Sequence, residues 1–367
     1  MSRPSILVIG TGLIGTSIAL GARDMGFDVF LDDPSPTTRA LAVDMGAGVA
    51  WSGGLGSPDL VVVAAPPDVA AARVIQALSD FPEAVVTDVA SVKANIEKAV
   101  LASAAEPANY VGSHPMAGRA RSGAAFADKD LFYGHSWVLV PTEYTCRNAV
   151  AKVKEFAVEL GAVPLTMTSK EHDEAVAYVS HVPQLVSSLL ASRLLDAPTS
   201  ALDLAGQGLR DTTRIAASDP GLWTAIVAGN AGPIAHILRE MADDLSVVVD
   251  RLEKYNAGDK AGVVGVVSDA VASGNRGVSR IPGKHGGAQR LWAEIEILVP
   301  DQPGELGRLF SDFGKCHVNI EDLMLEHSAG KKFGLARIMV DPAIVTKAVS
   351  QIERCGWRVV SAGEGSR

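Results

Sequence analysis

The segment Gly10-Thr11-Gly12-Leu13-Ile14-Gly15 carries three glycines at a spacing that lets a backbone approach a pyrophosphate closely. It follows a short apolar run and opens an expected helix, and two adjacent carboxylates, Asp32 and Asp33, come about 20 residues later. In that context the spacing is typical of dinucleotide binding. A plain glycine turn followed by ordinary loop aspartates is the competing interpretation.

The same two carboxylates indicate which dinucleotide binds. A carboxylate at the end of the second strand accepts hydrogen bonds from a ribose 2′-hydroxyl and repels a 2′-phosphate. We therefore predict NAD as the cofactor rather than NADP. Asp33 is the preferred ribose ligand and Asp32 is the alternative.

Four more polar or turn segments come directly after expected strands. They are Ala65-Pro66-Pro67-Asp68, Asp88–Lys93 (DVASVK), Ser113-His114-Pro115 and Pro141-Thr142. Ligands of open α/β sheets bind beyond the carboxyl ends of the strands. We therefore expect Ser91 and His114 to face the cofactor, with His114 held on a stiff turn, and Pro66 to border the nucleotide. A histidine that only caps or packs is the alternative interpretation of His114.

Two arginines in the second half of the chain could hold an anionic ligand. Arg210 and Arg214 are four residues apart and share a face if this segment is helical. Two guanidinium groups on one face repel each other unless they meet anions, and bidentate bonds to a dicarboxylate would satisfy both. A solvated basic face paired with Asp203 or Asp211 explains the spacing equally well.

A histidine and an amide lie near an expected helix kink. His181 and Gln184 are three residues apart and share a helix face beside Pro183. A kink frees a backbone carbonyl and often borders a site. The pattern by itself favours a histidine at a helix interface over a ligand-binding one.

Up to about residue 165, short β-type runs alternate with helical stretches along the sequence, and these elements position the candidate residues. Several runs are continuously apolar, as in strands that are buried on both faces. The pattern predicts a parallel, doubly wound dinucleotide-binding domain of the Rossmann type over residues 1–167. The expected strands are Ser5–Ile9, Asp28–Leu31, Leu60–Ala64, Ala84–Thr87, Tyr110–Gly112 and Trp137–Val140.

From Ser169 the pattern changes to long helices. Ser169 is expected to cap a helix that runs through Leu195, and Asp219 with Pro220 begins another stretch whose apolar periodicity continues to about Leu252. These helices are more apolar than one chain can cover. We therefore predict that residues 168–272 form a helical domain that binds substrate and dimerises.

The remainder of the chain is predicted to be a linker followed by a small separate domain. Residues 273–289 are rich in glycine and basic residues, which favours a linker, although the charges of Arg280–Gly287 could close over an anionic site. Residues 290–367 alternate strand, helix, strand, strand, helix, strand, which predicts a ferredoxin-like βαββαβ unit. Its expected strands are Leu291–Val299, Val318–Glu326, Phe333–Val340 and Trp357–Val360, with helices at Glu305–Phe313 and Ala343–Arg354.

The composition narrows the class of protein. Among 367 residues, 47% are apolar and 20% charged, as expected for a packed globular chain, and the net charge of −9 argues against nucleic acid or an anionic membrane as partner. Cys146, Cys316 and Cys355 are too few and too far apart for a disulfide framework or a metal site, so we predict no metal and a cytoplasmic location. The first residues lack the pattern of a signal peptide.

Taken in order, the segments GTGLIG, DVASVK, SHPMAG, SHVPQ and RDTTRIAASDP resemble the prephenate dehydrogenase family, the oxidative enzymes of tyrosine biosynthesis. The resemblance covers about residues 5–255 and is specific because several ordered motifs carry it. The segment Asp301–Leu306 (DQPGEL) resembles an ACT domain, a regulatory module that binds amino acids.

The resemblance implies roles for the candidate site residues. His114 matches a catalytic histidine that bonds to the substrate's C4 hydroxyl, and Ser91 matches a serine that orients both. Arg214 matches an arginine that holds a substrate carboxylate, Arg210 a nearby basic position, and His181 a site histidine. The C-terminal unit is then expected to bind tyrosine, with Asp301, Pro303, Gly304, Leu306 and Asn319 as its candidate contacts; a purely structural oligomerisation domain is the alternative.

The implied reaction is the oxidative decarboxylation of prephenate. Hydride leaves C4 for the nicotinamide, a neutral His114 accepts the hydroxyl proton, and carbon dioxide leaves as the ring becomes aromatic. Two positions depart from the family pattern: Gln184 stands where a second histidine is common, and Ala120 replaces a common glutamate. These departures leave arogenate open as an alternative substrate.

Two more distant alternatives remain. One is an amino-acid sensor that binds NAD without catalysis, which predicts a damaged site, although His114, Ser91 and Arg214 are all present. The other is a dehydrogenase of β-hydroxy acids, which should carry a catalytic lysine in the helical domain, where no convincing candidate is found.

Overall fold

The computed structural model describes residues 3–53, 56–103, 106–118, 123–259, 262–282, 292–327 and 333–364. The chain forms two compact units. One contains residues up to 202 together with 211–241, and the other contains residues 203–210 and those from 242 onward. Within the described residues, no helix is both long enough and apolar enough to cross a membrane.

The first unit is built on an eight-stranded sheet with the order β3-β2-β1-β4-β5-β6-β7-β8. All six predicted strands are present, and two short edge strands that the sequence analysis missed complete the sheet. The strands are β1 Ser5–Ile9, β2 Asp28–Asp32, β3 Val49–Ala50, β4 Leu60–Val63, β5 Val85–Asp88, β6 Tyr110–Pro115, β7 Ser136–Pro141 and β8 Val163–Thr166. The central strands β4 and β5 are buried along their whole length, as their continuous apolar runs predict.

The sheet is parallel except at one place, because β7 runs antiparallel to β6. The expectation of an entirely parallel sheet is wrong there for a simple reason. A parallel connection needs a long crossover, usually an α-helix, and the described part of the segment between β6 and β7 contains only the short 3₁₀ turn Ala124–Phe126. The chain therefore returns beside β6 in the opposite direction.

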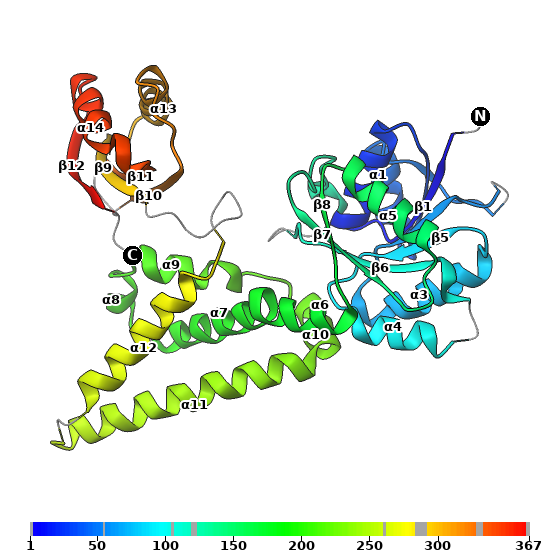
Figure 1. The fold of residues 1–367 in the computed structure, drawn as a ribbon, viewed down its shortest axis with the longest axis horizontal. Helices are drawn as coiled ribbons and strands as arrows, with labels where there is room; N and C mark the ends of the chain where they lie inside the picture. Colours follow the sequence, from blue (N-terminus) through cyan, green and yellow to red (C-terminus); the bar gives the residue numbers. More distant parts are fainter. Residues whose placement is uncertain are drawn as a thin grey trace. The chain divides into compact units, whose positions relative to one another are not determined.

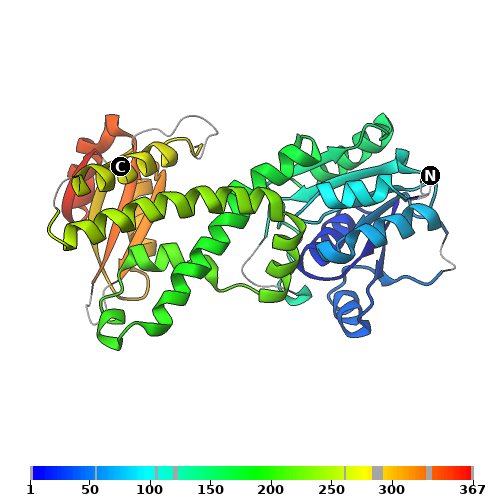
Figure 2. The same ribbon diagram turned by 90° about the horizontal axis from the view of Figure 1, so that it is seen from below.

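Helices cover both faces of this sheet, as a doubly wound fold requires (Figures 1 and 2). Residues from α1 and α5 belong to one buried cluster, and residues from α3 and α4 belong to the cluster on the other face. The helices are α1 Leu13–Asp24, α2 Pro36–Asp44, α3 Pro67–Asp80, α4 Ala94–Leu101 and α5 Arg147–Glu159.

The predicted long helix after residue 168 is a broken one. It consists of α6 Ser169–Val176, a π-helical segment Ala177–His181, and α7 Val182–Ser192. The π-helical segment ends two residues before Pro183, whose ring removes a backbone donor, so the helix is irregular at the place where the kink is predicted. The cap is Thr168 rather than Ser169: its hydroxyl accepts from the backbone of Glu171, whose carboxylate accepts in return from Thr168.

Further helices follow, and one of them corrects the predicted linker. Asp219 caps the helix that begins at Pro220, as expected, because its Oδ1 accepts from the backbone N–H of Leu222 at 2.7 Å. The helices are α8 Thr199–Leu202, α9 Gln207–Thr213, α10 Pro220–Gly229, α11 Ala231–Asn256 and α12 Val263–Val278. The helix α12 turns back from the end of α11 (Figure 1) and contains the first six residues of the segment predicted as a linker.

The C-terminal part of the second unit has the predicted βαββαβ order. Its antiparallel sheet has the order β10-β11-β9-β12, and apolar residues of β9 and β11 form one buried cluster with apolar residues of α13 and α14. The elements are β9 Ala293–Pro300, α13 Glu305–Lys315, β10 Asp322–His327, β11 Phe333–Val340, α14 Val345–Arg354 and β12 Arg358–Glu364. Alternating burial along β9 and β11 follows from the two-residue side-chain period of a strand with one covered face.

Candidate active site

The ring of His114 is joined to a second imidazole from a distant part of the chain. His114 lies in β6, and its Nδ1 is 2.8 Å from Nε2 of His172 in α6. Nδ1 of His172 is in turn 2.8 Å from Oδ1 of Asp173. His172 and Asp173 are buried, whereas His114 keeps part of its surface exposed. The three side chains form a continuous hydrogen-bonded row that ends at His114.

The carboxylate of Asp173 is anchored to the start of α4. Its Oδ1 accepts from the backbone N–H of Lys93 at 2.8 Å, and its Oδ2 accepts from that of Ala94 at 2.9 Å. A negative charge at a helix N-terminus is also favoured by the helix dipole. The helix α6 is therefore tied to the end of the loop that carries Ser91.

Asn230, between α10 and α11, connects this row to His181. Its Nδ2 donates to the carbonyl oxygen of Asp173 at 2.7 Å and lies 3.1 Å from Nδ1 of His181. The buried ring of His181 packs edge-on against Trp223, with the ring centroids 6.1 Å apart. Burial lowers the pKa of His181 to about 4, so the ring is neutral near pH 7 and can accept at Nδ1. The structure thus brings His114 and His181 into one network.

A buried ion pair lies close to His114. Nζ of Lys93 pairs with Oδ1 of Asp88, and the Tyr110 hydroxyl donates to Oδ2 of the same carboxylate at 2.7 Å. The side chains of Lys93 and Asp88 are 1% and 0% exposed. Burial lowers the pKa of His114 well below its usual value, and the nearby His172, Lys93 and His181 lower it further. His114 is therefore held in the neutral form that a proton acceptor requires.

Two expectations about the strand ends are corrected. His114 is not on a turn after a strand, because β6 continues through Pro115. Because β7 runs antiparallel to β6, Pro141 at the end of β7 pairs with Val111 near the start of β6. The segment Pro141-Thr142 therefore lies toward the opposite end of β6 from His114. Ser91 lies, as expected, in the loop after β5 and is half-buried, but no hydrogen bond within the described chain joins it to His114.

The arginines lie in a different local structure from the one predicted. Arg210 is in α9, which ends at Thr213, and Arg214 begins the 3₁₀ turn Arg214–Ala216, so the two do not share one continuous α-helix. Both side chains are exposed. The turn that carries Arg214 packs against α7, which carries Gln184.

Gln184 is buried, and its amide bonds within this helical region. Its Nε2 donates to Ser188 Oγ at 3.3 Å, and its Oε1 accepts from Ser218 Oγ at 3.4 Å. The glutamine therefore contacts the segment just after Arg214. The other departure from the family pattern, Ala120, lies outside the described residues, as do Lys284, His285 and Gly287 of the predicted loop; Arg280 lies just beyond the end of α12.

The glycine-rich turn has the geometry that a pyrophosphate needs. Gly10 has a φ of +100°, and a Cβ there would lie 2.5 Å from the carbonyl oxygen of Ala64. At Gly12 a Cβ would meet no atom within 4 Å, so the start of α1 faces open space. Leu13 and Ile14 are the first residues of that helix. The turn therefore leaves room for a phosphate at a helix N-terminus.

The two candidate carboxylates differ in their contacts. Asp33 Oδ2 accepts from the backbone N–H and hydroxyl of Thr11 at 2.7 and 3.0 Å, and its Oδ1 accepts from Ser35 N. Asp33 thus lies beside the glycine-rich turn and retains one acceptor position. Asp32 ends β2 and lies 3.5 Å from a guanidinium nitrogen of Arg39. Pro66 precedes α3, just beyond the carboxyl end of β4.

The predicted regulatory residues lie in the C-terminal unit. Asp301, Pro303 and Gly304 form an exposed turn before α13, where Gly304 has a φ of +91°. Leu306 lies in the first turn of that helix and packs partly against the core. Asn319 is not on a strand, as was expected, because β10 begins at Asp322; its Nδ2 donates to Glu321 Oε1 at 2.6 Å.

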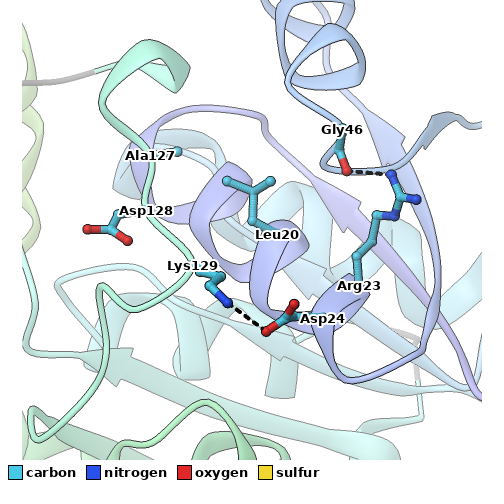
Figure 3. A pocket seen from close by; sticks show the side chains of 7 residues that line it. All are labelled: Leu20, Arg23, Asp24, Gly46, Ala127, Asp128 and Lys129. Carbon is cyan, nitrogen blue, oxygen red and sulfur yellow. Dashed lines mark hydrogen bonds and ion pairs between the residues drawn. The ribbon is translucent and has the colours of Figure 1, made fainter.

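An open depression occurs elsewhere on the first unit, at the C-terminal end of α1 (Figure 3). Its two cations already have partners there: Arg23 donates to the carbonyl of Gly46, and Lys129 pairs with Asp24 at 2.8 Å. The residues that line it are Leu20, Arg23, Asp24, Gly46, Ala127, Asp128 and Lys129. None of the predicted site residues is among them, so the candidate site remains the histidine network.

Sequence analysis missed four members of that network: His172, Asp173, Asn230 and the buried Lys93, which was quoted within a motif but given no role. One signal was available for the first two. His172 and Asp173 are four and three residues before Val176, so helical spacing puts all three on one face, and that face is buried. Two titratable side chains on a core-facing helix surface indicate a polar network. Asn230 offered no comparable signal.

Comparison with known proteins supports an assignment. Residues 18–166 match the family model described as prephenate dehydrogenase, nucleotide-binding domain, and residues 168–259 match prephenate dehydrogenase, dimerization domain. The chain is 32% identical over 355 residues to the probable prephenate dehydrogenase NovF of Streptomyces niveus. The aligned region covers 96% of this chain and 98% of that protein.

Solved structures agree. Prephenate dehydrogenase from A. aeolicus in complex with hydroxyphenyl propionate and NAD+ is 26% identical, with a TM-score of 0.63 over 75% of this chain and 99% of that one. Arogenate dehydrogenase from Synechocystis is 27% identical, with a TM-score of 0.60 over 74% and 99% of the two chains. The paired matches to both domain models, together with the dinucleotide turn and the histidine network, lead to one conclusion: the chain belongs to the prephenate dehydrogenase family and is an NAD-dependent oxidoreductase.

Proposed function

We propose that this enzyme oxidatively decarboxylates prephenate to 4-hydroxyphenylpyruvate in tyrosine biosynthesis, with His114 as the general base. The hydrogen bonding and the protonation state of the His114 ring support its assignment as the base. Nδ1 of His114 is engaged by His172, while its Nε2 has no hydrogen-bond partner among the described residues. Burial and neighbouring groups hold the pKa of His114 well below its usual value, so the ring is neutral and can accept the C4 hydroxyl proton.

The remaining roles follow from position and charge. NAD, when bound, accepts the hydride that leaves C4. Gly10, Gly12, Leu13, Ile14 and Gly15 would hold its pyrophosphate, Asp33 or Asp32 its ribose, and Pro66 would border it. Loss of carbon dioxide makes the ring aromatic, so the protein mainly has to orient the substrate and remove one proton.

The substrate's carboxylates need cationic partners. Arg214 is exposed, and no ion pair in the described part of the chain uses it, so its guanidinium could hold a carboxylate bidentately. Arg210 is proposed as a second basic contact. His181 and Gln184 would border the substrate, and Ser91, in the loop after β5, would orient the hydroxyl and His114.

The assignment of the base is tested by His114→Asn, which removes the basic nitrogen with little change in volume. We expect NAD affinity measured by calorimetry to be unchanged and kcat to fall by about 10²–10⁴-fold, the usual contribution of a general base. His135→Asn, at an exposed site, is the control. Near-normal turnover in the His114 variant would remove His114 from this role.

Arogenate is the second candidate substrate, because Gln184 stands where the family often has a histidine and because an arogenate dehydrogenase is among the similar structures. The two substrates differ in whether the side chain carries a keto group or an ammonium. Initial rates with each substrate, followed by NADH absorbance with NAD and with NADP, test both choices. A kcat/KM that is higher with arogenate would reverse the substrate assignment.

We also propose that the enzyme is a homodimer through its helical region. Leu189, Leu195 and Leu245 are 62%, 86% and 63% exposed, which leaves apolar helix surface for a second copy to cover. Sedimentation equilibrium tests this, and the double variant Leu189→Glu, Leu245→Glu should shift the measured mass toward that of a monomer.

We propose that the enzyme works in a reducing compartment such as the cytoplasm, which the three free thiols fit.

Regulation by tyrosine through an ACT-type C-terminal unit is the last proposal. The ferredoxin-like order of that unit and the exposed turn before α13 support it, since a carboxylate is favoured at a helix N-terminus. Asp301, Pro303, Gly304, Leu306 and Asn319 are the proposed contacts. Calorimetric titration of the full chain with tyrosine, compared with Gly304→Val, tests it; no heat with either protein would favour a structural role for this unit.

A further inference from the structure

Asp173, His172 and His114 form a hydrogen-bonded row that ends at the proposed base. We propose that His172 is a positioning residue that fixes the proton of His114 on Nδ1, and so leaves Nε2 as the basic nitrogen. The proposal rests on the proposed role of His114 as the general base. It assigns a function to two buried residues, His172 and Asp173, that need not touch the substrate.

The direction of the hydrogen bonds is set at the Asp173 end. Its carboxylate accepts from two backbone N–H groups, those of Lys93 at 2.8 Å and Ala94 at 2.9 Å, and backbone nitrogens can only donate. An ionised carboxylate is an acceptor only, so Nδ1 of His172, 2.8 Å from the same Oδ1, has to carry a proton and donate it.

The donor at His172 fixes the direction of the next hydrogen bond, the one to His114. A neutral imidazole carries one proton, so when Nδ1 of His172 is the donor, its Nε2 is an acceptor. That nitrogen is 2.8 Å from Nδ1 of His114, which must therefore donate. His114 in its neutral form has no second proton, and its Nε2 is left with a lone pair. This is the nitrogen that has no partner among the described residues.

The alternative arrangement would disable the base. If His172 presented an N–H to His114, Nδ1 of His114 would have to accept, and the neutral ring would carry its proton on Nε2. An imidazole in that tautomer cannot take a proton from a substrate through Nε2. Burial adds to the constraint, because His172 is 0% exposed and water cannot replace the lost partner.

The row also serves the charged state that follows proton transfer. When Nε2 of His114 has accepted a proton, both ring nitrogens are donors, and Nδ1 can still donate to His172 without rearrangement. The negative charge of Asp173, one imidazole away, favours the positive charge on His114. In serine proteases a buried aspartate that orients a histidine has the same two effects, and its change to asparagine selects the wrong tautomer and lowers kcat about 10⁴-fold.

The test compares two substitutions at one position in the full-length enzyme. His172→Leu removes the acceptor, whereas His172→Gln can keep an acceptor oxygen facing His114. We expect kcat to fall about 10²–10⁴-fold in the leucine variant and about 10-fold or less in the glutamine variant, with KM and NAD affinity changed by less than about threefold in both. His236→Leu, at an exposed helix position, is the control.

A spectroscopic measurement keeps the proposal testable if a variant fails to fold. In the unaltered protein with ¹⁵N-labelled histidine, long-range proton–nitrogen spectra should show His114 protonated at Nδ1 and His172 also at Nδ1. The His114 signals are identified by their loss in His114→Asn. A proton on Nε2 of neutral His114 would overturn the proposal.

The kinetic outcomes separate the two proposals. Equal activity of folded leucine and glutamine variants would assign His172 a packing role only. A leucine variant that keeps turnover, together with an inactive His114→Asn, would remove the positioning role and leave the base in place. Normal turnover in His114→Asn would instead reject the proposed function on which the positioning role depends.

Discussion

A Cβ atom on Gly15 would lie 1.9 Å from the carbonyl oxygen of Gly10. The first turn of α1 therefore packs directly on the backbone of the glycine-rich turn that precedes it. Gly15 is a packing requirement of the fold itself, whereas Gly12 faces open space and has an ordinary φ of −71°. The two glycines of one motif thus have different physical reasons for being glycine.

This difference predicts different effects of alanine at the two positions. Gly12→Ala should leave the unfolding midpoint nearly unchanged but weaken NAD binding about tenfold or more, because the added methyl group occupies space that a pyrophosphate approaches. Gly15→Ala should lower the free energy of unfolding by about 1–3 kcal/mol, as expected for overpacking. Urea unfolding and NAD calorimetry measure both; a destabilised Gly12 variant with intact NAD affinity would contradict the assignment.

The buried ion pair predicts a large stability effect. In Lys93→Met the carboxylate of Asp88 loses its cation but remains buried, and breaking a buried pair by removing one partner costs about 3–5 kcal/mol. Lys98→Met, five residues later in α4 and exposed, should change the free energy of unfolding by less than about 0.5 kcal/mol. Comparable urea midpoints for the two variants would show that the pair contributes little.

The activity of the enzyme should persist below the ordinary titration range of histidine. Because burial and the neighbours His172, Lys93 and His181 hold the pKa of His114 well below 6.5, the proposed base stays neutral as the pH falls through that value. The acid limb of a kcat/KM profile, which reports the free enzyme, should therefore lie well below pH 6.5. Loss of activity centred at pH 6.5 would indicate an ordinary histidine.

Folding stability should also depend on pH through His114 and His181. Their folded pKa values are both depressed, that of His181 to about 4, while an unfolded histidine titrates near 6.5. Below that pH the unfolded chain binds more protons, so the contribution is fully present above about pH 6.5 and is lost as the pH falls toward 4. Urea unfolding at several pH values measures the slope, which should be smaller in His181→Asn.

The exposed Arg214 predicts a change in substrate binding without a change in cofactor binding. Arg214→Ala should raise KM for the substrate by about tenfold or more, since hydrogen bonds to charged groups are worth about 1.5–3 kcal/mol, and should leave NAD affinity unaltered. Arg147→Ala, exposed at the start of α5, is the matched control. An unchanged KM in the Arg214 variant would reject a role in holding the carboxylate.

Local sequence patterns predicted most elements of this protein. Short β-type runs, several of them continuously apolar, identified six of the eight strands of the first sheet, alternation identified β9 and β11, and Asp219 with Pro220 identified the start of α10. Glycine spacing identified the tight turn between β1 and α1, where Gly10 has a φ of +100°. These features could be predicted because a strand, a cap or a tight turn depends on residues that are neighbours in the chain.

Errors occurred where a local pattern had two structural outcomes. The glycines Gly274 and Gly277 favoured a linker, but they lie inside α12. The strand β7 was recognised, but its direction was not, because direction depends on how the preceding segment returns to the sheet. Because β7 runs antiparallel to β6, Pro141-Thr142 lies away from the candidate site instead of beside it.

The sequence by itself determined the fold class, the glycine-rich turn before α1 and the choice of His114 and His181 as candidate site residues. Only the tertiary structure decided their partners: His172 is 58 residues from His114 along the chain, and Asn230 is 49 residues from His181. The physical reason is that a hydrogen bond between distant elements depends on how a helix packs against a sheet. Burial then makes each of those contacts consequential, because a polar group without water needs a partner from the protein.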